Sequence, residues 1–267
     1  MADKIRISKR KDYNEQLRLY NSLSKNLNAK LKRLFAKTAR QAEQEYIANQ
    51  DMYYFFTEPF TDGLYKILES HYRLVINTMA TRMVKMRRKQ DEEYDALVKT
   101  YVADVLAGQV TNISVTTEAQ IKTIITQAIA GKIIIDKIPQ TSIFQIGRLI
   151  RKNKSFAPYR ARMIARTETH STMNFTNFAI SGQLGLNNPV KQWNTASDER
   201  VRDWHKVMDN KKVGRDEYFK VLTPVAGGTF TEKRMLYTGD MLNGGPLNVI
   251  NCRCFTLYYD SEDEIIL

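Results

Sequence analysis

Hydrophobic positions in the first part of the chain repeat at steps of three and four residues. Because an α-helix has about 3.6 residues per turn, side chains at this spacing lie on one face. The pattern predicts a long helix whose apolar stripe must be covered by partner helices. That stripe consists of Tyr13, Leu17, Tyr20, Leu27, Leu31 and Leu34.

Candidate partner helices follow along the chain. Apolar residues recur at helical spacing over residues 64–83 and again over 94–105, and the second segment is expected to end at Gly108. Short connections between such segments favour antiparallel neighbours. The first part of the chain is therefore expected to form an antiparallel helical bundle.

Thr117 and Gln120 have the spacing of a capping box, in which a hydroxyl and an amide satisfy free backbone N–H groups. They predict a new helix through Ile129 that stops at Gly131, since glycine adopts the left-handed backbone that ends many helices. Further helices are expected at residues 142–152 and 158–181, the second beginning with Pro158 and stopping at Gly182.

After Gly182 the pattern changes. Eight of the twelve glycines lie from Gly182 onward, and β-type runs are expected over residues 190–193 and 249–259. Between them, Ser197 or Asp198 is expected to cap a short helix through His205. The predicted fold class is α+β: a mainly α-helical N-terminal bundle at 1–157, followed at 158–267 by a small α+β module with short strands and long loops.

Positive charge is concentrated in the first of these regions. The chain has 41 Lys and Arg against 29 Asp and Glu, a formal charge of +12. Residues 1–157 hold 27 basic and 16 acidic side chains, or +11, whereas residues 158–267 hold 14 and 13, or +1. Clustered basic residues suit a polyanion such as nucleic acid, although each cluster also fits a solvated helix face.

Three stretches carry most of this charge: residues 1–40, residues 82–89, and the stretch from Arg148 to Arg166. We expect their basic side chains to contact double-stranded DNA without sequence preference, through phosphates. The candidate DNA-binding residues are Arg82, Lys85, Arg87, Arg88, Lys89, Arg148, Arg151, Lys152 and Lys154.

Cys252 and Cys254 are the only cysteines. In a strand, residues two apart point to the same face, and His205 in the preceding helix could approach that face. Such ligands suit a structural zinc ion, with Asp198 or water as the fourth ligand. The alternative is that both thiols pack as small apolar groups, because a Cys-x-Cys pair with a distant histidine lacks the spacing of well-known zinc motifs.

Four separated motifs near the end of the chain carry a family resemblance. They are Ile164-Ala165-Arg166-Thr167-Glu168-Thr169; Lys191-x-Trp193 with Asp198-Glu199-Arg200-Val201-Arg202-x-x-His205; Tyr237-x-Gly239-Asp240; and Asn251-Cys252-Arg253-Cys254. Their order and spacing resemble the phage Mu F-like family of minor head and head-morphogenesis proteins. Two positions depart from the family pattern: Thr238 stands where proline is common, and Asn210 stands where a turn glycine is usual.

The resemblance implies a structural protein of a tailed bacteriophage virion, made in the host cytoplasm and placed inside the capsid near the portal. Its implied role is to support head morphogenesis and DNA packaging or ejection, in multiple copies per particle. The implied partners are the portal protein, the major capsid protein and double-stranded DNA. No membrane partner is expected, because no apolar run approaches the roughly 20 residues that cross a bilayer.

The motif residues are expected to hold the C-terminal module together. Opposite charges at several of these positions predict an ion-pair network that fixes the loops, and Trp193 and Trp204 are expected to be core residues. The structural motif residues are Arg166, Glu168, Trp193, Asp198, Arg200, Arg202, Asp240 and Asn251.

Two other functions compete with this prediction. One is a portal-binding connector or scaffold-like protein whose basic helices meet an acidic partner surface without DNA contact. The other is a nucleic-acid-processing enzyme using Glu168, His170 and His205 as acid and base. The sequence shows no nucleophile, phosphate loop or paired carboxylates at diagnostic spacing, so we expect the chain not to be an enzyme.

Overall fold

The structure is a computed structural model, and it describes residues 9–50, 59–84, 92–182 and 188–260. The chain groups into two compact units. One, here called the bundle unit, comprises residues 25–71 and 101–165; the other, the module unit, comprises residues 1–24, 72–100 and 166–267. Long helices combine with short strands, which confirms the α+β fold class. The functional division at residue 157 stays a prediction.

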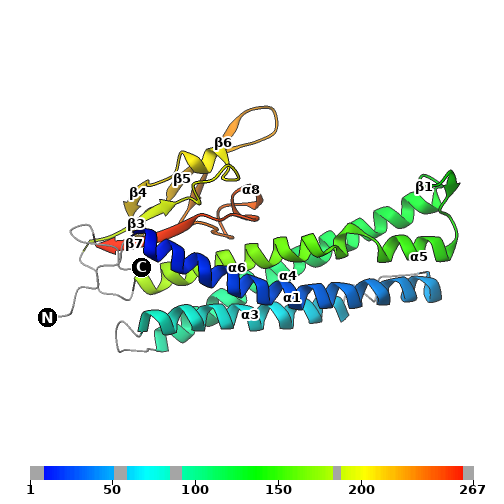
Figure 1. Cartoon of the computed structure of the whole chain (residues 1–267), viewed down its shortest axis with the longest axis horizontal. Coiled ribbons are helices and arrows are strands. Elements are labelled where there is room, and N and C mark those ends of the chain that lie inside the picture. The colour runs from blue at the N-terminus through cyan, green and yellow to red at the C-terminus, as the bar shows by residue number, and fades with distance from the viewer. Residues whose placement is uncertain (1–8, 51–58, 85–91, 183–187, 261–267) are drawn as a thin grey trace. The chain divides into compact units, whose positions relative to one another are not determined.

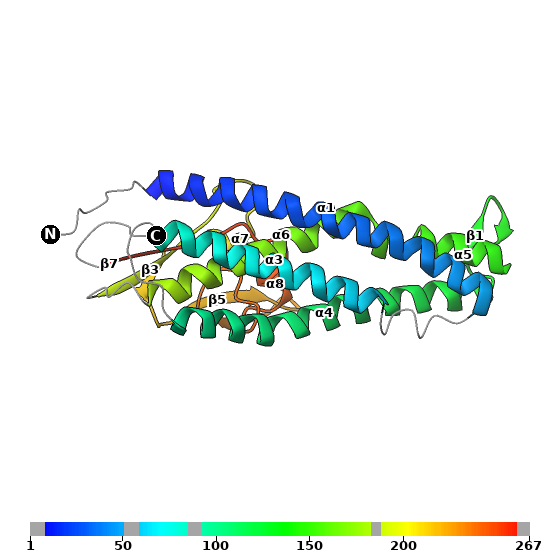
Figure 2. The same ribbon diagram turned by 90° about the horizontal axis from the view of Figure 1, so that it is seen from below.

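Four long helices hold more than half of the described residues: α1 (Lys9–Asn49), α3 (Pro59–Val84), α4 (Glu92–Ile129) and α6 (Pro158–Ser181) (Figures 1 and 2). The helical periodicity at the start of α1 and in α3 is confirmed. Among the described residues, no helix has the length and apolarity that crossing a bilayer requires.

The bundle unit has an apolar core drawn from several helices. Phe35 of α1 packs against Phe60 of α3 and against Phe156, with ring centroids 6.1 and 6.4 Å apart. Burying these rings and the aliphatic side chains beside them supplies the hydrophobic free energy that holds the helices together. Further fully buried members are Leu27, Leu31, Leu64, Leu68 and Ile121.

The predicted break in α4 is wrong, because the helix runs without interruption through Gly108 and Thr117. A single glycine costs a helix only about 1 kcal/mol, and buried apolar residues on both sides outweigh that cost. Thr117 caps nothing: its hydroxyl donates to the carbonyl of Ile113 at 2.6 Å and accepts from Arg160 at 2.8 Å. Gln120 accepts a hydrogen bond from Ser155.

The expected end of α4 is confirmed, since Gly131 follows it with φ +67°. A short hairpin then joins α4 to the next helix, with β1 (Ile134–Ile135) paired to β2 (Ile138–Pro139). Its two turn residues, Asp136 and Lys137, both have positive φ, as a type I′ turn requires.

The predicted helix at 142–152 is confirmed as α5 (Ile143–Arg151). Ser142 and Gln145 form a full capping box at its start. A single 3-10 turn, η1 (Lys154–Phe156), leads into α6, whose first residue is Pro158 as expected.

The module unit gathers the remaining strands and short helices (Figure 1). Its three-stranded antiparallel sheet has the order β4 (Lys212–Gly214), β3 (Pro189–Asn194), β7 (Phe255–Asp260), and β5 (Phe219–Pro224) pairs with β6 (Phe230–Met235). The described part of the unit also contains two single-turn helices, α7 (Asp203–Lys206) and α8 (Pro246–Val249).

Two predictions in the module unit are wrong in detail. The expected strand at 249–259 begins only at Phe255, because Gly245 and Pro246 start α8 and Asn251, at φ 55°, turns the chain after it. The cap of α7 is Arg202, with no side-chain capping bond. Asp198 instead accepts the backbone N–H of Arg200 at 3.0 Å.

Trp193 is a core residue, as predicted, whereas Trp204 is only partly buried. Trp193 is fully buried and lies in a cluster with Met208, Phe219 and both cysteines, while Trp204 packs against that cluster. A second cluster joins Phe255 to residues of α1, α3 and α6. The first cluster surrounds the candidate site.

Candidate metal centre

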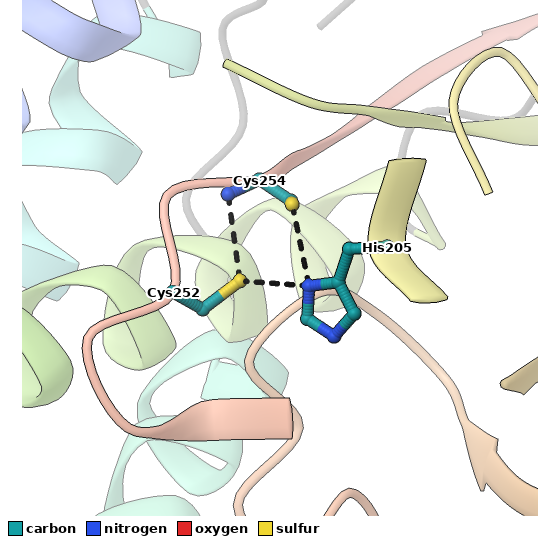
Figure 3. Close-up of side chains that lie close together, drawn as sticks. All are labelled: His205, Cys252 and Cys254. Atoms are coloured by element: carbon teal, nitrogen blue, oxygen red, sulfur yellow. Dashed lines mark hydrogen bonds between the residues drawn. The ribbon is translucent and has the colours of Figure 1, made fainter. Parts of the chain in front are cut away.

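His205, Cys252 and Cys254 come together in the module unit (Figure 3). The Nδ1 atom of His205 lies 3.7 Å from Sγ of Cys252 and 3.6 Å from Sγ of Cys254. The ligand atoms of all three residues lie within 4.8 Å of one another, and all three side chains are buried. The fold thus brings together the three residues that the sequence singled out, in an arrangement that could hold a metal ion.

The local chain path explains why the thiols converge. His205 is carried by α7, whereas the cysteines lie in the loop between α8 and β7, not in the strand that the sequence predicted. Asn251 turns the backbone with φ 55°, and its N–H donates to Thr167 Oγ1 at 2.9 Å. The loop curls so tightly that the Cys254 N–H points at Cys252 Sγ, 3.5 Å away (Figure 3).

The two thiols differ electrostatically. The hydrogen bond with Cys254, together with the contact with His205, holds the pKa of Cys252 well below its usual range, although burial opposes this effect. The hydrogen bond with Cys252, together with burial, raises the pKa of Cys254 well above its usual range. One sulfur is therefore predisposed to be a thiolate, which is the form that binds metals.

The carboxylate of Asp198, the predicted candidate for a fourth ligand, has a different partner. It accepts two hydrogen bonds from Arg253, at 2.5 and 2.6 Å, and Arg200 lies 3.6 Å away. The hydrogen bonds from Arg253 lower the pKa of Asp198 to about 2. This ion pair therefore fixes the position of Arg253, the residue between the two cysteines.

The other charged motif residues make separate contacts. Arg166 donates to Tyr20 Oη at 3.2 Å, Glu168 accepts from Tyr72, and Arg202 donates to the carbonyl of Ile250. Burial raises the pKa of Glu168 to about 7, against the opposing effect of its hydrogen bond with Tyr72. Each side chain ties a different pair of segments together.

Asp240 organises the loop before α8. Its carboxylate accepts the backbone N–H groups of Leu236, Leu242 and Asn243 at 2.9 to 3.2 Å. Gly239 has φ +75°, and a Cβ there would lie 2.6 Å from Nδ1 of His170, so no larger residue fits.

Thr238, which departs from the family pattern, is well accommodated beside this loop. Its backbone N–H donates to Thr256 Oγ1 at 2.9 Å, and its hydroxyl donates to Asn174 Oδ1 at 2.8 Å. Proline has no N–H and could not make the first bond. Asn210, the second departure, adopts φ 61°, so the expected turn survives.

The predicted DNA-binding residues fall into two groups. Residues 85–89 lie outside the described residues, and the side chain of Arg82, within α3, is not described either. Arg148, Arg151, Lys152 and Lys154 are all exposed on α5 and the turn after it, and Arg151 also contacts Glu43 at 3.1 Å. The second group can therefore meet a partner.

Sequence reasoning did not place three further residues at this site, although it had considered His170 as a possible acid or base. Asn248 contacts His205, Arg253 clamps Asp198, and the buried His170 donates its Nε2–H to the carbonyl of Cys254. Arg253 lies between the cysteines and could have been considered as a partner for Asp198. Nothing in the sequence marks Asn248, since only the fold brings α8 beside α7.

Comparison with known proteins identifies the family to which the chain belongs. The chain is 28% identical over 115 residues to the minor head protein GP7 of Bacillus phage SPP1; the alignment covers 43% of this chain and 34% of the relative, about a third of its length. No solved structure matches. The profile of the family described as "Phage Mu protein F like protein" matches residues 119–257, which are 139 of the 267 residues. The chain therefore belongs to the phage Mu protein F like family.

Proposed function

We propose that the chain is a structural minor head protein of a tailed bacteriophage that supports head morphogenesis and contacts packaged DNA without sequence preference. Membership of the Mu F-like family carries this proposal, and the relative from phage SPP1 is named a minor head protein. In the particle we place it inside the capsid near the portal, in multiple copies, with the portal protein and the major capsid protein as partners.

The burial of the candidate acid and base residues supports a structural role over catalysis. Glu168, His170 and His205 are 2%, 0% and 1% exposed, and each is held by neighbours within the fold. A catalytic group must reach its substrate. These three side chains instead make hydrogen bonds inside the module unit.

The DNA contact is proposed from charge. Residues 1–157 carry +11, and the exposed side chains of Arg148, Lys152 and Lys154 belong to one of its basic clusters. Neutralising phosphates releases counterions, so binding depends on salt and not on sequence. Such binding suits a protein that must meet any packaged genome.

Electrophoretic mobility shifts with unrelated duplexes test the DNA contact. Affinity should fall steeply between about 50 and 200 mM salt and should fall equally for all duplexes when Arg148, Lys152 and Lys154 are changed to Gln. The matched control changes Lys211, Lys220 and Arg234, which are exposed in the module unit, to Gln. Salt-insensitive binding, or equal losses in both triple variants, would contradict the proposal.

The rival structural function is a portal-binding connector without DNA contact. Pull-down of the portal protein after nuclease treatment separates the two: retention together with absent mobility shifts favours the connector. Proteomics of purified particles tests the virion location, and particles that lack this chain would overturn it.

A structural zinc ion bound by His205, Cys252 and Cys254 is part of the proposal. With zinc–sulfur bonds of about 2.3 Å and zinc–nitrogen bonds of about 2.0–2.1 Å, tetrahedral geometry separates sulfur from nitrogen by about 3.6 Å. The two nitrogen–sulfur distances here are 3.6 and 3.7 Å.

Elemental analysis of the purified full chain tests the zinc site. About one zinc per chain is expected in the wild type, and much less when Cys252 and Cys254 are both changed to Ser. A substitution at an exposed residue that is not a candidate ligand, such as Lys220→Gln, serves as the control. Wild-type protein that binds no zinc when supplied with it would refute this part of the proposal.

A further inference from the structure

Asn248 has a fully buried amide side chain that contacts His205, one of the three candidate metal ligands. Its Oδ1 accepts from Trp204 Nε1 at 2.8 Å and contacts His205 Nε2 at 3.1 Å. Its Nδ2 donates to Thr223 Oγ1 at 2.8 Å and to the carbonyl of Gly244 at 2.9 Å. The amide therefore connects α7, β5 and the loop before α8.

These partners allow only one orientation of the amide. The indole N–H of Trp204 can only donate, so it must face the oxygen, and the carbonyl of Gly244 can only accept, so it must face the nitrogen. The atom that faces His205 is consequently an acceptor. His205 must carry its proton on Nε2, which leaves the lone pair on Nδ1.

That lone pair faces two sulfur atoms. Nδ1 can accept a hydrogen bond from only one thiol, yet Cys252 and Cys254 both lie within 3.7 Å of it. A divalent ion between the three atoms would use the lone pair and both sulfurs together. Without Asn248, the proton could move to Nδ1 and block the imidazole as a ligand.

We infer that Asn248 is the positioning residue of the metal centre, holding His205 in the tautomer that binds zinc through Nδ1. The inference rests on the zinc site proposed above. Outer-shell partners of this kind orient ligating imidazoles, and their loss lowers metal affinity by about 10–100-fold. Sulfur and imidazole ligands select zinc over calcium or magnesium, which prefer oxygen.

The chain offers a matched control in Asn174. It is equally buried and accepts from Thr256 N at 3.0 Å and from Thr238 Oγ1, while its own Nδ2 donates to the carbonyl of His170. Asn174→Ala and Asn248→Ala each remove one buried, hydrogen-bonded amide from the module unit. Only the second removes the partner of His205.

Zinc affinity is measured in the full chain by competition with a chromophoric chelator. Asn248→Ala should weaken zinc binding about 10–100-fold, whereas Asn174→Ala should leave affinity within about threefold of wild type. The visible spectrum of the Co²⁺-loaded protein gives a second readout, since sulfur-ligated tetrahedral Co²⁺ absorbs strongly. Its intensity should fall in Asn248→Ala at a cobalt concentration that saturates the wild type.

Asn248→Asp keeps the inference testable even if Asn248→Ala fails to fold. Its carboxylate still accepts from His205 Nε2 but no longer donates to Thr223 or Gly244. It should therefore lose stability yet keep near-wild-type zinc affinity, which a merely structural role would not produce. Wild-type zinc binding with unchanged affinity in Asn248→Ala, or equal losses in Asn248→Asp and Asn248→Ala, would overturn the inference. No zinc binding by the wild type would instead refute the zinc site itself.

Discussion

The two compact units differ in what their helices bury. In the bundle unit, long helices bury leucine, isoleucine and phenylalanine, such as Leu31, Phe35 and Leu64. In the module unit, the second part of α6 buries mainly polar side chains. They are Thr167, Glu168, Thr169, His170, Ser171, Thr172, Asn174, Thr176, Asn177 and Ser181.

This difference affects how each unit responds to change. An apolar core gains stability in proportion to the area it buries and tolerates volume-conserving substitutions. A buried polar side chain gains little when paired and costs about 1–3 kcal/mol when its partner is lost. The module unit should therefore be the more sensitive to single polar substitutions, and the bundle unit to cavities.

Metal removal should produce the largest difference between the units. Free zinc at a thousand times its dissociation constant contributes about 4 kcal/mol, and this contribution should be lost from the module unit alone. Hydrogen exchange with and without a chelator measures it: protection should fall in β7 and α7 but not in α5, which lies wholly in the bundle unit. Equal losses in both units would contradict the comparison.

Leu68→Ala should be the most damaging of the substitutions considered for the bundle unit. Leu68 is fully buried in α3, and truncating such a leucine typically costs about 2–5 kcal/mol through lost burial and a residual cavity. Denaturant unfolding measures the loss. Zinc content should not change, and Leu74→Ala, at a 40% exposed position of the same helix, should cost far less.

Glu168→Gln should remove a pH dependence from the module unit. The pKa of Glu168 is about 7 in the folded chain against an ordinary 4.5, so the folded state holds more protons between these values. The free energy of unfolding should therefore fall as pH rises from 4.5 to 7, by on the order of 2–3 kcal/mol. Gln cannot ionise and still accepts from Tyr72, so the variant should be more stable than wild type at pH 8 and similar at pH 4.5.

Denaturant unfolding across that pH range provides the test, with the exposed Glu232→Gln as control. His71 in the bundle unit acts in the opposite direction: burial lowers its pKa to about 3, so its contribution is lost as pH falls from 6.5 toward 3. That effect is common to wild type and variant and cancels in their difference. A difference between Glu168→Gln and wild type that does not vary with pH would refute the assignment.

Ser142→Ala should have the smallest effect. It removes one half of the capping box at the start of α5 and should cost about 1 kcal/mol. Thermal unfolding measures it, and Thr116→Ala within α4 is a control that removes no cap. A loss as large as that of Leu68→Ala would contradict this ranking.

The sequence predicted most of the helices because periodicity and caps are local signals. The stripe from Tyr13, the cap at Ser142 and the stop at Gly131 each depend on residues a few positions away. The break in α4 was mispredicted because Thr117 has a tertiary partner, Arg160, which no local pattern reveals. Tertiary packing, and not the local sequence, therefore determines that α4 continues through Thr117.

The candidate site was predicted only in part for the same reason. Residue chemistry singled out His205, Cys252 and Cys254 as zinc ligands, and the fold brings them together. The strand assigned to the cysteines was wrong because Pro246 and Asn251 turn the chain. Asn248 could not be found, since its role depends on contacts with residues more than 20 positions away in the sequence.

The ion pair between Arg253 and Asp198 affects how the centre would exchange its metal. Because the residue between the two cysteines is clamped by two hydrogen bonds, the loop keeps its shape when no ion is held. Recapture then requires no search through loop conformations, so little ordering entropy opposes it. We therefore expect loss and regain of the ion to be reversible without unfolding, and expect Asp198→Ala, which removes the ion pair, to slow recapture.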